Sequence, residues 1–165
     1  MACVMTSLIA MPALAEQTAT EPLTGHRIGL GYSQSSIDGL ELGAGLKLEY
    51  GYDINDVFGV SVSYEKYKDS YSDLINLRTM RFGTDIGYAF RVDDGQNTLK
   101  PYFALGLNMY EEELLGISYS NSSLYYGIGL RSHLGEHFYL TSEVTWSDLG
   151  YDDSQYVGIT FGYKF

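Results

Sequence analysis

Charged side chains recur in this 165-residue chain inside stretches where every second residue is small or polar. Residues two apart in a β-strand share a face, so these charges would gather on the small and polar side of their strands. A charge removed from water is tolerated when a charge of opposite sign pairs with it. These recurring charged residues comprise four cations and four anions. The pattern predicts a structural ion-pair network made of Arg27, Lys47, Glu49, Glu65, Arg81, Asp85, Arg131 and Glu143.

Catalytic chemistry would need a nucleophile beside a base, and two groups of residues approach that requirement. Ser132 and His133 are adjacent, so in a strand they point to opposite faces and cannot form a nucleophile–base pair. His137, Thr141 and Glu143 would share the small and polar face, but no serine accompanies them there. We therefore expect a protein that is not an enzyme.

Metal and cofactor sites find little support in the residue types. The only cysteine, Cys3, lies in the apolar N-terminal stretch, so neither a disulfide framework nor a thiolate metal site is expected elsewhere. Asp148, Asp152 and Asp153 could hold a divalent cation weakly, but their spacing does not match a standard calcium loop. We expect no cofactor and no bound metal.

The elements that must position the charged residues are strands of one recurring kind. From Gly25 onward, segments of roughly ten residues alternate between apolar and small or polar side chains, and turn residues separate the segments. A strand that spans a membrane needs about 9 to 11 residues, and an even number of strands lets an antiparallel up-and-down barrel close. The pattern predicts an all-β chain of eight strands at residues 26–34, 42–52, 57–66, 78–91, 98–110, 123–134, 137–146 and 156–165.

The bulk of each face indicates which one would touch lipid. The glycine, serine and charge on the small face cannot fill a dry core, and the bulky face would be too large an apolar patch for a soluble monomer. We therefore predict that residues 25–165 form a transmembrane β-barrel with an apolar exterior. The alternative is a soluble β-sandwich or a lipocalin-like barrel. The interior of eight strands just holds side chains, so the ion pairs would plug the lumen, with a narrow pore as the alternative.

The connections between strands differ in predicted length. Those after the first, third, fifth and seventh strands are mostly longer than the others, which is typical of transmembrane barrels with long external loops and short periplasmic turns. This places both chain termini in the periplasm. Tyrosines and aliphatic residues in the long loops could form an adhesive surface, whereas the alternative is that acidic loops only keep the surface solvated. The candidate contact residues are Tyr71, Leu114, Leu115, Ile117, Tyr119 and Tyr151.

The N-terminus has the character of an export signal. Residues 1–15 are uncharged and mostly apolar, and Ala13-Leu14-Ala15 before Glu16 fits a small-x-small cleavage pattern. The positively charged beginning of such a signal is missing, so we expect the true start to lie upstream or to have been trimmed. The alternative is a short apolar helix docked on the domain. Residues 16–24 are polar and would form a lead-in to the barrel.

The overall charge excludes two classes of partner. A formal net charge of −11 leaves no basic patch to neutralise the phosphates of a nucleic acid. Because acidic residues outnumber Lys and Arg, the composition also argues against a peripheral protein held to anionic lipid.

Residues 25–165 resemble the small eight-stranded outer-membrane proteins of the OmpX/Ail type and the OmpA barrel. The resemblance rests on Glu49-Tyr50-Gly51-Tyr52-Asp53, which runs into Asn55-Asp56, and on the closing stretch Gly158–Phe165. It implies a bacterial outer-membrane location, with contacts to outer-membrane lipid and lipopolysaccharide. It also implies that Phe161, Tyr163 and Phe165 form the C-terminal signal read by the barrel insertion machinery.

Members of that group serve as adhesins, confer resistance to host defence or act in envelope integrity. The resemblance therefore implies a non-enzymatic surface protein that meets host or environmental partners through its external loops. A structural envelope protein without a specific ligand is the alternative, and a narrow pore is the second.

Overall fold

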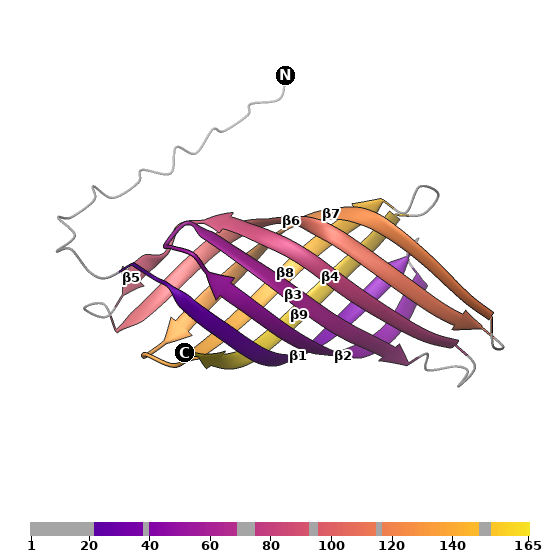
Figure 1. The fold of residues 1–165 in the computed structure, drawn as a ribbon, viewed down its shortest axis with the longest axis horizontal. Helices are drawn as coiled ribbons and strands as arrows, with labels where there is room; N and C mark the ends of the chain where they lie inside the picture. Colours follow the sequence, from indigo (N-terminus) through magenta and orange to yellow (C-terminus); the bar gives the residue numbers. More distant parts are fainter. Residues whose placement is uncertain (1–21, 38–39, 69–74, 93–95, 115–116, 149–152) are drawn as a thin grey trace, which may run out of the picture.

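The computed structural model describes residues 22–165 apart from 38–39, 69–74, 93–95, 115–116 and 149–152. In that part of the chain all regular structure is β (Figure 1). The strands are β1 (Gly25–Ile37), β2 (Leu40–Asp53), β3 (Phe58–Lys68), β4 (Ile75–Gly87), β5 (Phe90–Val92), β6 (Asn97–Leu114), β7 (Ile117–Leu134), β8 (Phe138–Asp148) and β9 (Asp153–Lys164).

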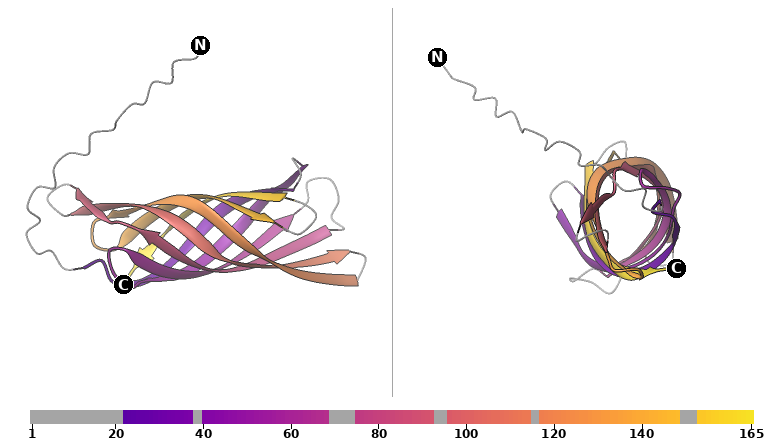
Figure 2. Two further views of the ribbon diagram at one scale, coloured as in Figure 1. Left: turned by 90° about the horizontal axis from the view of Figure 1, so that it is seen from above. Right: turned by 90° about the vertical axis from the view of Figure 1, so that its left-hand side faces the viewer.

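The strands form one closed antiparallel sheet. Successive strands pair with each other except β4 and β5, which both pair with β6, and β9 pairs with β1, so the sheet closes on itself. The end-on view in Figure 2 shows the resulting cylinder. This confirms the predicted eight-stranded up-and-down barrel, because β4 and β5 are successive parts of one barrel strand. A closed barrel leaves no sheet edge along the wall, as a lipid environment requires.

The interruption between β4 and β5 lies opposite a proline. Gly87 pairs with Tyr102 and Phe90 with Leu99, so the register is unchanged across the gap and places Tyr88 opposite Pro101. The Tyr88 N–H donates to the Pro101 carbonyl at 3.4 Å, but Pro101 has no N–H to return the bond. The strand predicted at 78–91 is therefore one barrel strand with a local break.

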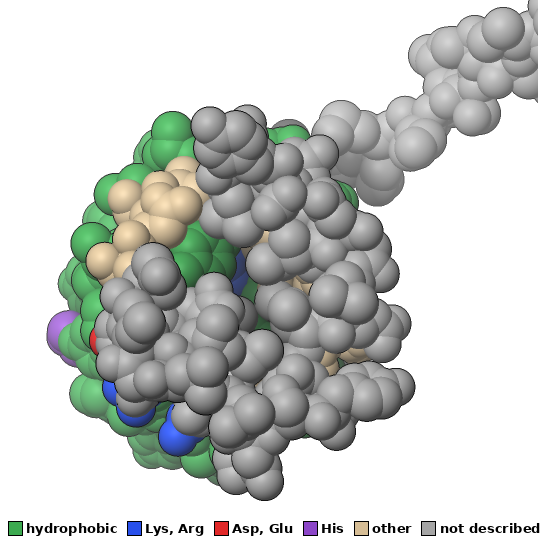
Figure 3. All heavy atoms as spheres, turned by 90° about the vertical axis from the view of Figure 1, so that its right-hand side faces the viewer, with side chains coloured by type: hydrophobic (Ala, Val, Ile, Leu, Met, Phe, Trp, Pro, Cys, Tyr) green, Lys and Arg blue, Asp and Glu red, His purple; other side chains and the backbone are tan. Residues whose placement is uncertain are grey.

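Side chains alternate between a buried polar interior and an exposed apolar exterior. Leu30 is 71% exposed and Leu46 is 75% exposed, whereas Arg27 is 0% and Lys47 is 2% exposed. The space-filling view in Figure 3 shows hydrophobic side chains around the outside of the barrel. Because water would penalise such a continuous apolar surface, the exterior is the surface that faces hydrocarbon.

The two ends of the barrel differ, though not as predicted. The end that carries Gly25 and Phe165, here called the terminal end, has connections at 54–57, 93–96 and 135–137. The other end, here called the hairpin end, has connections at 38–39, 69–74, 115–116 and 149–152. The predicted contrast in loop length is wrong, because residues predicted as loops at 35–41 and 111–122 continue the strand ladders instead. An antiparallel ladder pairs backbone groups whatever the side chains are, so it extends past the apolar band.

At the hairpin end, strand β7 extends further than its neighbour β8. Strands β6 and β7 have 18 residues each and stay paired from Asn97–Leu134 to Leu114–Ile117. The pairing of β7 with β8 ends at Tyr125 opposite Ser147. Among the described residues, Ile117–Leu124 of β7 therefore has a ladder partner only on its β6 side, and we call its other side the free edge.

Interior tyrosines lie over glycines of adjacent strands. Tyr139 is opposite Gly162, which is in turn opposite Gly29, and a Cβ at either glycine would meet the Tyr139 side chain. Gly129 lies opposite Tyr102 in the same way, and a Cβ there would meet only the Tyr102 ring within the contact range. Glycine is needed at these positions for close approach, and the interior is filled by rings rather than left open.

Candidate functional site

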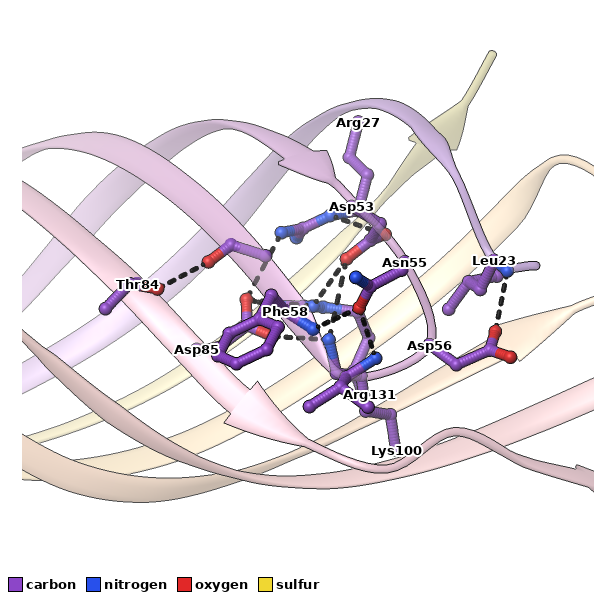
Figure 4. Close-up of polar contacts among 12 residues, drawn as sticks. Leu23, Arg27, Asp53, Asn55, Asp56, Phe58, Thr84, Asp85, Lys100 and Arg131 are labelled. Atoms are coloured by element: carbon purple, nitrogen blue, oxygen red, sulfur yellow. Dashed lines mark hydrogen bonds and ion pairs between the residues drawn. The ribbon is translucent and has the colours of Figure 1, made fainter.

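The first ionic cluster lies inside the barrel toward the terminal end (Figure 4). Asp53 forms an ion pair with Arg27 Nε at 3.0 Å through Oδ2, and its Oδ1 accepts a hydrogen bond from Arg131 Nη1 at 3.1 Å. Asp85 pairs with Lys100 Nζ at 2.7 Å and with Arg131 Nη2 at 3.2 Å. All five side chains are at most 5% exposed, so each charge is compensated by its neighbours rather than by water. We call these five residues the terminal cluster.

A second cluster occupies the middle of the barrel. Glu143 Oε1 lies 3.1 Å from both Lys47 Nζ and Arg81 Nη1. Lys47 also pairs with Glu49 at 2.8 Å, and Arg81 lies 3.8 Å from Glu65. We call these five residues the central cluster.

A direct ion pair links the two clusters. Arg27 Nη1 donates to Glu49 Oε1 at 3.2 Å, which joins the terminal and central clusters into one network.

Aromatic rings fill the space around the cations. The guanidinium carbon of Arg81 lies 4.2 Å from the ring centre of Tyr125 and 4.1 Å from that of Tyr156. Arg131 lies 5.0 Å from the ring centre of Tyr102, whose hydroxyl donates to Glu143 at 3.1 Å. Cation–π contacts are strongest where water is excluded. The lumen at this level is therefore occupied by packed and paired side chains.

All eight residues of the predicted ion-pair network point inward and take part in these contacts. Sequence reasoning missed Asp53, which it placed in a turn, and Lys100, which lies two residues before the inward-facing Tyr102. The alternation of the strands could have identified both, since each shares the inward parity of its strand. With them, five cations balance five carboxylates in the two clusters. The net charge of −11 therefore comes from the rest of the chain.

His133 and His137 lie in different environments and do not share a face. His133 is buried, with Nδ1 2.9 Å from Thr98 Oγ1 and Nε2 3.6 Å from Asp53. His137 was expected on the inner face, but it lies exposed in the turn before β8 and stacks on Tyr163 with ring centres 5.1 Å apart. The expectation failed because the strand alternation begins only at Phe138.

The described part of the chain has neither a metal-ligand group nor a membrane-spanning helix. None of its His, Cys, Asp and Glu residues form a group of three or more that could hold a metal ion. No helix long and apolar enough to cross a membrane occurs there.

The predicted contact residues lie wholly or partly outside the described part of the chain. Tyr71, Leu115 and Tyr151 lie outside the described residues. The backbones of Leu114, Ile117 and Tyr119 belong to β6 and β7, but their side chains are outside the described part.

The proposed C-terminal signal residues lie on the outer surface of the last strand. Phe161 is 55%, Tyr163 is 41% and Phe165 is 63% exposed. Phe165 exchanges two backbone hydrogen bonds with His26, each 2.9 Å long, so the chain terminus seals the seam between β9 and β1.

Comparisons with known proteins agree with this architecture. A family model described as an outer membrane protein beta-barrel domain matches residues 1–165. No curated protein sequence matches the chain.

Solved structures share the fold at low identity. Ail, the attachment invasion locus protein of Yersinia pestis, is 24% identical over 88% of this chain and 100% of its own, with a TM-score of 0.53; its structure was solved with the heparin analogue sucrose octasulfate. Neisserial surface protein A is 17% identical over 86% of this chain and 97% of its own, with a TM-score of 0.62. OprG, an outer membrane protein from Pseudomonas aeruginosa, is 16% identical over 87% and 97%, with a TM-score of 0.55.

Proposed function

Because this chain belongs to the outer membrane protein β-barrel domain family, we propose that it is a non-enzymatic surface protein whose hairpin end binds partners outside the cell. The partners would be host or environmental molecules, in a role of the adhesion, colonisation or defence-resistance type. The membrane-embedded part has a structural role, because its polar interior is consumed by ion pairs and ring contacts.

The free edge of β7 is the observation that carries this proposal. A strand edge without a partner presents a row of backbone donors and acceptors, which an extended segment of another protein can pair with. Natural proteins usually protect such edges with lysine, proline or other charged residues. Residues 117–124 contain no charged residue and no proline. This edge is therefore suited to binding a strand rather than to excluding one.

The chemistry next to the free edge favours a basic partner. Strand β6, the only described ladder partner of this part of β7, carries Glu111, Glu112 and Glu113 in sequence. Adjacent strands lie about 4.8 Å apart, so a strand added beside β7 would lie roughly 10 Å from β6, near enough for the negative charge of this segment to attract a cation. An extended segment with lysine or arginine would match both the backbone and the charge.

We propose an orientation in the membrane that is supported by where the lead-in joins the barrel. Residues 22–24 enter β1 at the terminal end, where the Leu23 N–H donates to Asp56 at 2.6 Å. We infer that residues 1–15 are an export signal and residues 16–24 a periplasmic lead-in, followed by the barrel at 25–165. Both termini would then lie in the periplasm, and Phe161, Tyr163 and Phe165 would be available to the insertion machinery during assembly.

Shortening the β6–β7 hairpin tests the proposal. Glu112 and Tyr119 are directly opposite and lie in register with the closing pair Leu114–Ile117, so residues 113–118 can be replaced by Asn-Gly, which closes a two-residue hairpin turn. Cells displaying this variant should lose most of their binding to host-cell or matrix surfaces, while the variant still inserts and migrates as a heat-modifiable barrel. A matched variant, Glu136→Ser in the turn at the terminal end, should bind as the original protein does.

Unchanged binding by the shortened variant would contradict the surface role and favour the structural envelope alternative. The pore alternative is opposed by the packed lumen and is tested separately below.

A further inference from the structure

Two methionines lie next to each other on the outer surface near the hairpin end. The chain has five methionines, and in the part that the structure describes only Met80 on β4 and Met109 on β6 occur. They are directly opposite in the ladder and both point outward, 41% and 51% exposed. Directly opposite side chains have Cβ atoms about 4.5–5.5 Å apart, so the two thioethers form one local site.

This methionine pair lies at the margin of the apolar band. In the next outward row toward the hairpin end, Arg78 is opposite Glu111, and in the next row toward the middle of the barrel, Phe82 is opposite Leu107. Tyr64 on β3 shares the row of the pair, and tyrosine is enriched where a membrane meets water. Two residues of strand span about 7 Å, so polar and apolar surface meet at the thioethers. A water-soluble reagent can therefore reach them without crossing the hydrocarbon.

A groove of about 510 Å³ on the outer surface gives access to the pair. Met80 and Met109 line it together with Arg78 and Ser122. Ser122 is directly opposite Met109 on β7, the side away from Met80. The groove therefore places hydrogen-bond donors, a hydroxyl and a guanidinium, beside sulfur atoms that accept hydrogen bonds only weakly.

We propose that Met80 and Met109 form a reversible oxidation site for peroxides. A lone pair of the thioether sulfur attacks one oxygen of hydrogen peroxide, the O–O bond breaks and an S–O bond forms. The departing hydroxide takes the proton that remains on the transferred oxygen, so the products are one sulfoxide and one water. The sulfur loses two electrons and the peroxide gains them.

The groups around the pair favour the oxidised form. A sulfoxide oxygen is polar and accepts hydrogen bonds, so it can use the Ser122 hydroxyl and the N–H groups of Arg78. Glu111 also lines the groove, but it lies 4.0 Å from Arg78 and both side chains are exposed, so this weak ion pair leaves guanidinium donors available. The negative charge of Glu111 does not repel an uncharged oxidant.

Oxidation at this pair changes the outer surface and leaves the interior intact. Each sulfoxide replaces an apolar group by a polar one, so on β4 and β6 the apolar band would end one row deeper, at Phe82 and Leu107. Reductases specific for each sulfoxide epimer restore the thioether, which makes the change reversible. The reaction needs only the groove and a peroxide, so it does not depend on the proposed partner surface.

Peptide mass spectrometry of the full chain in lipid nanodiscs treated with hydrogen peroxide tests the proposal. Met80 and Met109 should each gain one oxygen atom, while heat-modifiable migration in gels stays that of the folded barrel. Treatment of the oxidised, folded barrel with the two reductases should remove both oxygen atoms.

The variant Met109→Leu/Leu107→Met is the matched reference, because it moves one thioether a row deeper. Leucine and methionine have similar volumes, and Leu107 is 48% exposed against 51% for Met109, so depth is the main difference. The relocated thioether should be oxidised about 10-fold more slowly, because peroxide must give up hydrogen bonds with water to reach it.

A second pair of variants tests the donor beside the pair. Ser122→Ala should slow the oxidation of Met109 about 3- to 5-fold, the effect of one lost hydrogen bond. Ser142→Ala, opposite Leu130 on β8 and outside this groove, should leave both rates unchanged. An unaffected Ser122→Ala variant would overturn the role of the donor.

Equal oxidation rates at positions 107 and 109 would overturn the proposal, since the margin would then confer no reactivity. Loss of heat-modifiable migration on oxidation, or sulfoxides that both reductases leave in place, would overturn it as well and indicate irreversible damage.

Discussion

Asp53 is the most connected charge inside the barrel. Its two oxygens contact Arg27 and Arg131, its carboxylate lies 4.0 Å from Lys100, and it is completely buried (Figure 4). His133 lies 3.6 Å away on the remaining side. Because the cations around it are also buried, removing this one carboxylate would leave positive charges facing one another without water. Stability at the residue scale therefore depends on the completeness of the network rather than on any single pair.

Asp53→Ala should lower the free energy of unfolding by about 3–5 kcal/mol, the usual cost of leaving a buried charge without its partner. Urea unfolding in detergent micelles, followed by the change in migration of the folded barrel, measures this. Glu111→Ala breaks an exposed pair of similar composition and should cost less than about 1 kcal/mol. Equal effects of the two substitutions would show that the network contributes no more than a surface ion pair.

At the scale of elements, alternation identified every barrel strand but not where each one ends. Inside the apolar band the two faces differ in every second residue, so parity places Arg81 and Glu143 correctly. Beyond the band, as in Ser118-Tyr119-Ser120-Asn121, both faces are polar and the pattern that marks a strand is lost. The same loss of contrast put Asp53 in a turn. The overhang of β7 above β8 depends on register between distant segments, which local pattern does not encode.

The break between β4 and β5 gives an element-scale prediction. Pro101→Ala supplies a backbone N–H on β6 opposite Tyr88, so the ladder should become continuous from Ile75 to Val92. Total stability should change little, because the added hydrogen bond is offset by the greater freedom of the unfolded chain. Hydrogen exchange in micelles should show the new amide at position 101 as protected as that of Phe103. Exchange as fast as an amide in the turn 135–137 would contradict this.

For the whole molecule, the balance of charge separates two regions. Taken together, the two interior clusters hold equal numbers of cations and carboxylates. The net negative charge of the chain is therefore carried by the other residues. An ion crossing the barrel would have to displace Arg81 from between two tyrosine rings and from Glu143. Because side chains fill the lumen at this level, we expect no continuous water path from one end of the barrel to the other.

Planar-bilayer recordings of the full chain should show no discrete conductance steps. Heat-modifiable migration of the reconstituted sample confirms that folded barrels are present, and a wide porin incorporated in the same membrane shows that single openings would be detected. Reproducible unitary currents that scale with salt concentration would contradict the expectation that the filled lumen does not conduct ions. They would support the pore alternative.

The network also constrains how the barrel is assembled. Its ten charges come from β1, β2, β3, β4, β6, β7 and β8, and several find their partners across the cylinder rather than on the next strand, as Lys47 does with Glu143. A partly assembled sheet exposed to hydrocarbon would hold these charged groups without their ion-pair partners. Insertion one hairpin at a time is therefore unfavourable, and the inner face must stay sheltered until the last strand meets the first.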